Sequence, residues 1–335
     1  MIKIGIIGMG YWGPNLLRNF TANKNFNIKY ICDIKTENLK KYLNLNDNIS
    51  LVKDYQLITE DKSIDAIIIA TPVNTHFKIA YDALNNNKHV FVEKPLADSS
   101  LKCKKLISIA NKKKLTLFVD HTFLYTEAVM KLKALSRKKN FGKIMYYDST
   151  RINLGLIQND INVLWDLAVH DLAILNYISD EKPILISAVG HKHFKRKPIT
   201  SAYMAIKYDS NFIAHINVNW LSPVKVRQTI VAGTKRMILY NDLEASDKLN
   251  VYNKGVDIIK NSDSSNYLVN YKIGDTYIPN LKNKEALAVA VSEFYSSIKH
   301  NSPPKTDGIS GLKVVQILEA ADKSMKNNGK PIKLL

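Results

Sequence analysis

The hydrophobic pattern of residues 1–120 alternates short apolar runs with amphipathic stretches. The apolar runs predict strands, and the stretches with apolar positions at helical spacing predict helices. In chain order the predicted strands are 2–7, 26–32, 64–70, 89–92 and 115–119, and the predicted helices are 11–22, 77–84 and 99–111. Such alternation builds βαβ units, so this part of the chain predicts an α/β fold with a doubly wound parallel sheet.

The pattern changes near residue 122. After that point the predicted elements are a helix at 123–139, a strand at 143–152, a helix at 163–178, consecutive strands from 184 to 252, and helices at 284–299 and 309–327. Consecutive strands without intervening helices favour an open, mainly antiparallel sheet. We therefore predict two domains, a cofactor-binding domain at 1–122 and an α+β domain at 123–335.

A glycine-rich turn follows the first predicted strand and opens the first predicted helix. Its residues are Gly8, Met9, Gly10, Tyr11, Trp12 and Gly13. In this spacing the first glycine permits a tight turn, the second lets the backbone approach a pyrophosphate, and the third lets helix and strand pack closely. The phosphates then lie at a helix N-terminus, where free amides favour anions. The motif predicts a Rossmann domain that binds a dinucleotide, and a turn without ligand is the alternative.

Asp33 lies at the end of the second predicted strand, 20 residues after Gly13. At this distance a carboxylate reaches the adenosine ribose hydroxyls. A carboxylate there repels a 2′-phosphate, so the cofactor NAD is favoured over NADP. Lys35 lies close by and keeps NADP as the alternative. The neighbouring Ile34 is expected to contact the same cofactor.

Further candidate residues follow the next two long strands. Ligands of doubly wound sheets lie at the carboxyl ends of the strands. The candidates for cofactor binding there are Thr71, Pro72, Asn74, His76, Glu93 and Lys94. The alternative for Thr71, Pro72, Asn74 and His76 is that they form the start of a helix, which Thr75 caps, and that His76 packs in the core without contacting a ligand. Lys94, which Pro95 follows, is also a candidate for holding a substrate hydroxyl and stabilising a developing alkoxide.

The second domain contains Asp166 and His170, four residues apart in a predicted helix. This spacing places both side chains on one helix face. A histidine beside a carboxylate is suited to general-base catalysis, because the neighbour sets its tautomer. The alternative is a structural pair. A metal site would need a third ligand, which the sequence does not indicate, so we predict no metal.

The ordered set GMGYWG, Asp33, ATPVNTH, HVFVEKPLA and WDLAVHD resembles the Gfo/Idh/MocA oxidoreductases over essentially the whole chain. The resemblance implies that Lys94, Asp166 and His170 form the catalytic group. It also implies a second domain with an open antiparallel sheet, through which a homodimer or homotetramer forms.

Other stretches, among them GYWGPNLLRNF, HTFLYTEAV and WLSPVKVR, are similar to a narrower group of nucleotide-sugar 3-dehydrogenases. This similarity implies a substrate such as UDP-GlcNAc or its uronic acid, oxidised at C3. By position, the residues expected to line the sugar pocket are His121, Arg151, Asn153, Gln158 and Asn162. The alternative for each is a scaffold residue.

Composition narrows the choice of partner. The chain of 335 residues carries a formal charge of +18, but only six of its 48 basic residues are arginine. The basic runs are short and lack interleaved aromatic residues, which favours a solvated surface or an anionic small substrate over nucleic acid. Two cysteines exclude a disulfide framework and favour the reducing cytoplasm. No apolar run is long enough for a membrane helix.

The sequence therefore predicts an NAD-dependent dehydrogenase that acts on a CH–OH group of a sugar. His170 would take the hydroxyl proton, Lys94 would hold the oxygen, and Asp166 would orient one of them. Three alternatives stay open: an inositol or aldose dehydrogenase, a sugar oxidoreductase with a recycled cofactor, and a non-catalytic NAD-binding regulator.

Overall fold

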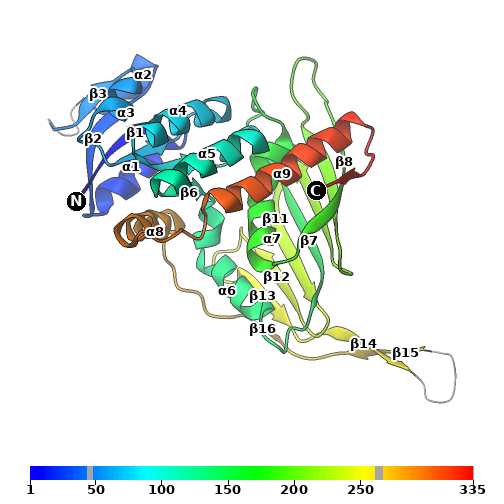
Figure 1. Ribbon diagram of the computed structural model, residues 1–335. Coiled ribbons are helices and arrows are strands. Elements are labelled where there is room, and N and C mark those ends of the chain that lie inside the picture. Colours follow the sequence, from blue (N-terminus) through cyan, green and yellow to red (C-terminus); the bar gives the residue numbers. More distant parts are fainter. Residues whose placement is uncertain (44–47, 261–266, 335) are drawn as a thin grey trace. The chain divides into compact units, whose positions relative to one another are not determined.

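The computed structural model describes residues 1–43, 48–260 and 267–334 (Figure 1). The chain divides into two compact units. The first unit comprises Met1–Tyr125 and Lys284–Gln316, and the second comprises Thr126–Asn283 and Ile317–Leu335. The division near residue 122 did not anticipate that a late segment belongs to the first unit. The assignment of separate functions to residues 1–122 and 123–335 stays a prediction.

The first unit is built on a parallel sheet, which confirms the predicted fold class. Six described strands pair in the order β3-β2-β1-β4-β5-β6. The strands are β1 (Ile2–Ile7), β2 (Phe26–Cys32), β3 (Ser50–Val52), β4 (Ala66–Ile69), β5 (His89–Glu93) and β6 (Leu117–Asp120). The carboxyl ends of β1, β4, β5 and β6 therefore share one edge, where the glycine-rich turn and Lys94 lie.

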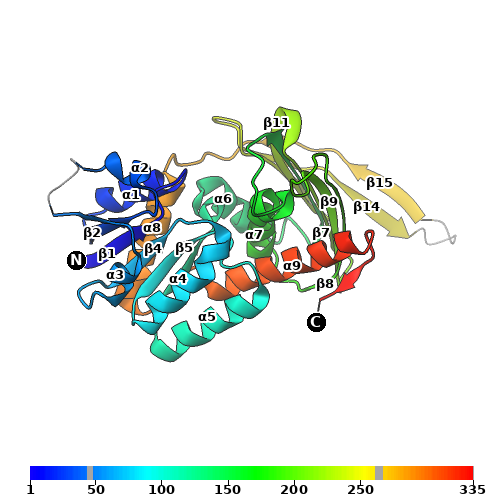
Figure 2. The same cartoon turned by 90° about the horizontal axis from the view of Figure 1, so that it is seen from above.

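Helices cover both faces of this sheet, as Figure 2 shows. Helices α1 and α8 lie on one face, and α4 and α5 lie on the other. The helices of this unit are α1 (Gly13–Ala22), α2 (Thr36–Lys40), α3 (Gln56–Glu60), α4 (Val73–Asn85), α5 (Ser100–Lys113), the 3-10 turn η1 (Thr122–Tyr125), α8 (Ala286–His300) and the start of α9 (Gly308–Lys326). The Ser99 side chain accepts from the Lys102 amide and so begins α5.

An aromatic cluster fills the face beneath α1 and α8. The Phe294 ring of α8 lies 5.5 Å from Phe91 and 5.7 Å from Phe118, measured between ring centroids. It also lies 6.4 Å from Phe20 and 6.1 Å from Phe26. Four of these five side chains are fully excluded from solvent, and Phe26 is 6% exposed. A residue from the end of the chain therefore completes the core of the first unit.

The second unit contains a mixed, mostly antiparallel sheet, as predicted. Nine described strands pair in the order β16-β13-β12-β11-β7-β10-β9-β8-β17, and only the β10–β7 pair is parallel. They are β7 (Ile144–Leu154), β8 (Pro183–His191), β9 (Ser201–Tyr208), β10 (Ile213–Asn219), β11 (Leu221–Gly233), β12 (Met237–Asn241), β13 (Leu249–Tyr252), β16 (Thr276–Tyr277) and β17 (Ile332–Lys333). Strands β14 (Gly255–Lys260) and β15 (Tyr267–Lys272) form a separate antiparallel pair.

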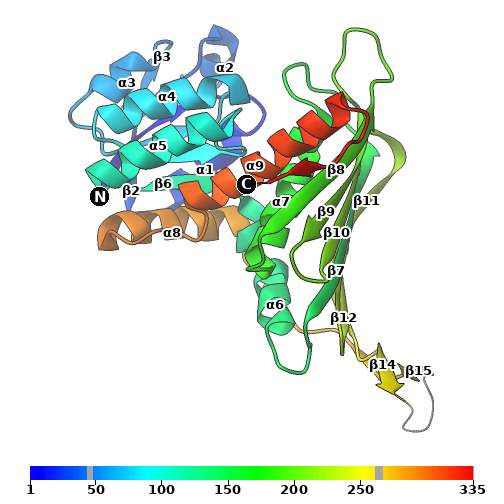
Figure 3. The same ribbon diagram turned by 45° about the vertical axis from the view of Figure 1, so that its right-hand side comes forward.

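Helices of the second unit lie along one face of its large sheet, as Figure 3 shows. They are α6 (Glu127–Ser136), the π-helical turn η2 (Leu164–Ala168), α7 (Val169–Ile178) and the later part of α9. The helix expected at 163–178 is thus a π turn followed by an α-helix. The helix expected at 123–139 is η1 followed by α6, which Thr126 caps by accepting from the Val129 amide. Every helix of the described residues is too short or too polar to span a bilayer.

Candidate active site

The glycine-rich turn leaves β1 with a backbone that requires glycine at two positions. Gly8 has φ +97°, and a Cβ on it would lie 2.6 Å from the Ala70 carbonyl carbon and oxygen. A Cβ on Gly13 would lie 2.2 Å from the Gly8 carbonyl oxygen. Gly10 faces open space and is exposed. The turn therefore packs tightly at Gly8 and Gly13 and leaves room at Gly10, beside the amino end of α1. This arrangement fits the pyrophosphate of a dinucleotide.

Asp33 follows β2 and braces the same turn. Its Oδ2 accepts from the Met9 amide at 2.7 Å and from Asn38 Nδ2 at 3.0 Å, and its Oδ1 accepts from the Lys35 amide at 2.8 Å. The residue is 8% exposed. A carboxylate offers about four acceptor positions, so capacity for one further hydrogen bond remains. That capacity fits a ribose hydroxyl, and the contact stays a prediction.

The other residues predicted around the turn differ in exposure. Met9 is buried, Trp12 is half-buried, and Tyr11 and Ile34 are 87% and 82% exposed. The Trp12 Nε1 atom is buried and has no acceptor at hydrogen-bonding geometry among the described residues.

The segment after β4 enters helix α4 directly. The Thr75 hydroxyl lies 2.7 Å from both Thr71 Oγ1 and the Pro72 carbonyl oxygen. His76 is 1% exposed, with Nδ1 2.9 Å from the Pro95 carbonyl oxygen and Nε2 2.8 Å from the Thr71 carbonyl oxygen. The ring therefore ties the loop after β4 to the loop after β5, which supports the packed alternative for His76.

Of the remaining candidates after β4, Pro72 and Asn74 are exposed and Thr71 is half-buried. Contact of these residues or of His76 with a cofactor stays a prediction.

Lys94 lies immediately after β5 and is half-buried. The peptide bond to Pro95 is cis. Burial raises the pKa values of Glu93 and Asp120, and the Lys94 ammonium opposes both shifts. Burial lowers the pKa of His121, and the same ammonium adds to that shift, so it lies close to all three groups. Asp120 was not among the site residues predicted from the sequence. It directly follows a predicted strand in the same way as Glu93, and this position could have identified it.

His121 is 2% exposed, and neither ring nitrogen has a hydrogen-bond partner among the described residues. Burial, together with the charge of Lys94, lowers the pKa of His121 to about 3. The ring is therefore neutral at pH 7 and offers one donor and one acceptor. This agrees with a polar ligand contact, which stays a prediction.

In the second unit, Asp166 lies on η2 and His170 lies one turn further on, in α7. Both side chains are half-buried. The Trp220 indole Nε1 donates to Asp166 Oδ2 at 3.0 Å. This bond, which connects residues distant in sequence, fixes one oxygen of the candidate carboxylate.

Four further hydrogen bonds fix the start of η2. Asn162 Oδ1 accepts from the amides of Leu164 at 3.0 Å and Trp165 at 3.3 Å. Asp322 of α9 accepts from Asn162 Nδ2 and from Trp165 Nε1, both at 2.8 Å. Asn162 therefore caps the turn, which is the scaffold alternative, and its contact with a sugar stays a prediction. Asp322 gave no signal in the sequence.

Arg151 of β7 is held in a buried ion pair. Its Nε and Nη2 atoms lie 2.8 Å and 3.0 Å from the two carboxylate oxygens of Asp171 in α7. Arg151 is 3% exposed and Asp171 is 1% exposed. The structure thus supports the scaffold alternative for Arg151. Asn153 and Gln158 are half-buried, at the end of β7 and in the loop after it, and their sugar contacts stay predictions.

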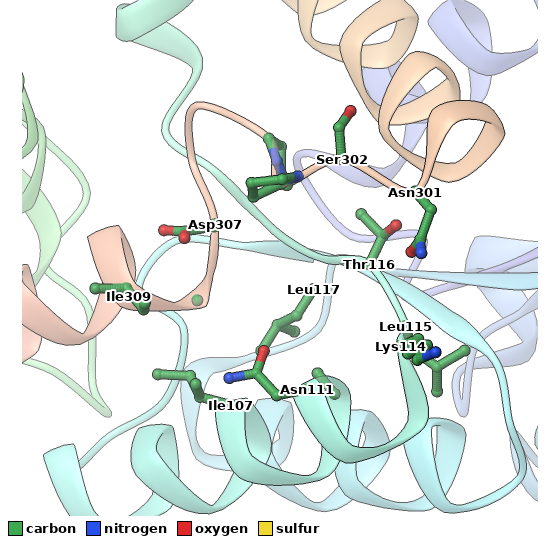
Figure 4. A pocket seen from close by; sticks show the side chains of 14 residues that line it. Ile107, Asn111, Lys114, Leu115, Thr116, Leu117, Asn301, Ser302, Asp307 and Ile309 are labelled. Atoms are coloured by element: carbon green, nitrogen blue, oxygen red, sulfur yellow. The ribbon is translucent and has the colours of Figure 1, made fainter.

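A cavity of about 420 Å³ lies elsewhere in the first unit (Figure 4). Among its lining side chains are Asn111, Lys114, Thr116 and Asp307. It lies at the amino end of β6, whereas Lys94 follows the carboxyl end of β5. The cavity is therefore separate from the candidate cofactor edge. Over the described part of the chain, no three His, Cys, Asp or Glu side chains gather in a way that could hold a metal ion.

Two family models match the chain. One, described as an oxidoreductase family with an NAD-binding Rossmann fold, matches residues 2–121. The other, described as the GFO/IDH/MocA C-terminal domain, matches residues 129–239.

Among curated proteins, the chain is 23% identical over 322 residues to UDP-N-acetylglucosamine 3-dehydrogenase of Acidithiobacillus ferrooxidans, with 94% of each chain covered. It is 22% identical over 338 residues to myo-inositol 2-dehydrogenase of Thermotoga maritima, with 97% of this chain and 96% of that one covered.

Solved structures show the same fold. UDP-N-acetylglucosamine 3-dehydrogenase from Acidithiobacillus ferrooxidans superposes with a TM-score of 0.81 at 20% identity, covering 98% of this chain and 99% of that one. An oxidoreductase from Agrobacterium radiobacter in complex with NAD+, L-tartaric acid and magnesium superposes with a TM-score of 0.80 at 16% identity, covering 99% and 98%.

Proposed function

Because the chain belongs to the GFO/IDH/MocA oxidoreductase family, we propose that it is an NAD-dependent dehydrogenase that oxidises a ring hydroxyl of a sugar. The observation that carries this proposal is the position of Lys94. It follows β5, at the same sheet edge as the glycine-rich turn after β1. A dinucleotide held by the turn therefore places its reactive end along the edge where an ammonium group can meet a substrate oxygen.

We propose that three side chains divide the work. Bound NAD supplies the hydride acceptor. Lys94 holds the substrate oxygen and neutralises the charge that develops on it. His170 takes the hydroxyl proton, because loss of a hydride from a neutral alcohol would otherwise leave a costly protonated carbonyl. Asp166, held by Trp220, orients the base.

We further propose that the sugar is linked to a nucleotide, such as UDP-GlcNAc or its uronic acid, and is oxidised at C3. A relative named for this activity is similar over 94% of the chain, and the formal charge of +18 suits a diphosphate. The second candidate substrate is an inositol, because a myo-inositol 2-dehydrogenase is similar over 97% of the chain. NAD rather than NADP, and a homodimer or homotetramer, complete the proposal.

The test is oxidation of UDP-GlcNAc, its uronic acid, myo-inositol and free aldoses, each with NAD and with NADP. We expect reduction of NAD with a nucleotide sugar. Lys94→Ala should lower turnover by about 10²-fold or more while NAD still binds. His170→Ala should lower it by about 10²–10⁴-fold. Lys53→Ala and His300→Ala, which change exposed residues, are the matched controls. Near-normal hydride transfer in His170→Ala would show that the base is another group.

A further inference from the structure

Two carboxyl groups lie side by side at the edge of the sheet that carries Lys94. Glu93 and Asp120 are register partners at the carboxyl ends of the parallel strands β5 and β6. Neighbouring strands lie about 4.8 Å apart, and side chains of register partners point to the same face. Asp120 is 1% exposed, and the Oε1 atom of the half-buried Glu93 is also buried. The pair is therefore largely removed from water.

The two groups lack enough donors for two negative charges. The Thr122 hydroxyl donates to Asp120 Oδ1 at 2.8 Å. Asp120 Oδ2 and Glu93 Oε1 have no donor among the described residues. Two buried carboxylates in this position would repel each other and leave both oxygens unsatisfied. One proton between the groups supplies the missing donor and removes one charge.

The ionisation behaviour of both groups agrees with this geometry. Burial, followed by the charge of Asp120, raises the pKa of Glu93 well above its usual range. Burial raises the pKa of Asp120 to about 6, although hydrogen bonds and the Lys94 ammonium oppose the shift. Of the other described titratable groups, the buried Tyr125 lies near Asp120, whose charge adds to the rise that burial causes in the pKa of Tyr125, and the neutral His121 follows Asp120 in the chain. Two groups this close lose their protons as a unit.

We propose that Glu93 and Asp120 share one proton near neutral pH, and that this singly charged pair is a positioning element for Lys94. The second half of the proposal rests on the function proposed for Lys94. One negative charge matches one ammonium group. The singly charged pair offers the ammonium one nearby opposite charge, whereas a doubly charged pair would drive its own members apart.

The pair also reaches the glycine-rich turn. The Trp12 indole N–H opposes the rise that burial causes in the pKa of Asp120, so it lies near that carboxyl group, although outside hydrogen-bonding geometry. Trp12 lies in the turn that is predicted to bind the cofactor pyrophosphate. The same pair therefore connects the cofactor turn after β1 with the lysine after β5, across strand β4, which lies between them in the sheet.

The first test is infrared spectroscopy of the protein without substrate, from pH 4 to pH 9. We expect the carbonyl band of a protonated carboxyl group to persist at pH 7. Asp120→Asn and Glu93→Gln should each remove it, because the new amide donates to the remaining carboxylate and lets it ionise. Glu60→Gln, which removes an exposed carboxyl group of the same unit, should leave it in place. Absence of the band at pH 7, or its survival in both single variants, would overturn the shared proton.

The second test is single-turnover hydride transfer as a function of pH. Each single amide variant keeps one negative charge. Its rate of hydride transfer should therefore lose the pH dependence that the pair causes, and it should stay closer to the rate of the unaltered protein than the rate of the double variant does. The double variant Glu93→Gln/Asp120→Asn has no charge and should transfer hydride more slowly than either single variant by about tenfold or more. A double variant as fast as the singles would overturn the positioning role.

The two tests also separate this proposal from the proposed function. The infrared bands require no substrate, so they report on the shared proton even if the protein is not a dehydrogenase. Absence of hydride transfer with every sugar would contradict the dehydrogenase assignment and leave the infrared result standing.

Discussion

At the scale of single residues, three carboxyl groups on one sheet edge have different surroundings. Asp33 accepts from three donors, two of them backbone amides. Asp120 receives one hydroxyl and faces Glu93. Donors favour the charged form of a carboxyl group, whereas burial beside another carboxyl group favours the protonated form. The same residue type is therefore surrounded by donors at one strand end and faces a second carboxyl group at another.

Asp33→Ser should change both cofactor preference and stability. The substitution removes the charge that opposes a 2′-phosphate, so the ratio of NADP to NAD dissociation constants should fall toward one. It also leaves the buried Met9 amide without its acceptor, which should cost about 1–3 kcal/mol of unfolding free energy. Titration of both cofactors by tryptophan fluorescence, together with urea unfolding, measures the two effects. Tighter binding of NADP than NAD by the unaltered protein would contradict the role of Asp33.

The raised pKa of Asp120 has a consequence for stability. The folded protein keeps a proton on Asp120 that the unfolded chain loses above its usual pKa of 3.8. This group therefore lowers the unfolding free energy progressively as pH rises from about 4 through about 6. Burial lowers the pKa of His121 from 6.5 to about 3, so this group acts in the opposite direction over the whole of that range.

The measurement must therefore compare two proteins at each pH. The unfolding free energy of the unaltered protein relative to Asp120→Asn should decrease between pH 4 and pH 8, as followed by urea unfolding. The difference in unfolding free energy between the unaltered protein and the control Glu60→Gln should change much less over the same pH range. A constant difference between the unaltered protein and Asp120→Asn would mean that Asp120 ionises normally.

At the scale of elements, buried polar bonds decide how the second unit presents its candidate residues. The Arg151–Asp171 pair joins β7 to α7, and the Tyr147 hydroxyl donates to the Asp171 carbonyl oxygen at 3.1 Å. His170 precedes Asp171 in the same helix. The ion pair therefore fixes the helix that carries the proposed base.

Removing one partner of this ion pair should destabilise the fold strongly. Arg151→Met leaves the Asp171 carboxylate buried without its partner, which should cost about 3–5 kcal/mol of unfolding free energy. Arg151→Met combined with Asp171→Leu should recover most of that loss, because no buried charge remains. Guanidinium unfolding of the three proteins is the measurement. Little loss in the single variant would mean that water reaches the pair.

Elements that depend on neighbouring residues could be predicted from the sequence, whereas contacts between distant segments could not. Strands β1 and β2 were predicted to the residue, because each is a local apolar run. Helices α2 and α3 have five residues each and strand β3 has three, too few for a period to emerge. The glycine-rich turn was predictable because its constraints lie within one short segment.

The contacts that the sequence missed join distant segments. Trp220 reaches Asp166 and Asp322 reaches Trp165, each across more than fifty residues. No local pattern encodes such pairs. The same limit explains why Arg151 and His76 resembled ligand-binding residues in sequence, since their buried partners come from other elements.

At the scale of the whole molecule, net charge is the feature that bears on the substrate. A formal charge of +18 attracts anions over several ångströms, and salt screens such attraction. This effect separates the two candidate substrates, because a nucleotide sugar carries a diphosphate and an inositol carries no charge.

At saturating NAD, rising salt should therefore raise the KM for a nucleotide sugar more than it lowers kcat. The KM for myo-inositol, measured in the same buffers, should stay nearly constant and serves as the control. A nucleotide-sugar KM that does not respond to salt would favour the inositol assignment.

The aromatic cluster beneath α8 bears on how the chain folds during its synthesis. Phe20, Phe26, Phe91 and Phe118 leave the ribosome well before Phe294, which completes their packing. Domains commonly fold from the N-terminus as they emerge, but this unit must wait for helix α8. Until then its four rings expose apolar surface to other nascent chains and to chaperones. A stalled or truncated translation product that ends after β6 should therefore aggregate rather than yield a working cofactor domain.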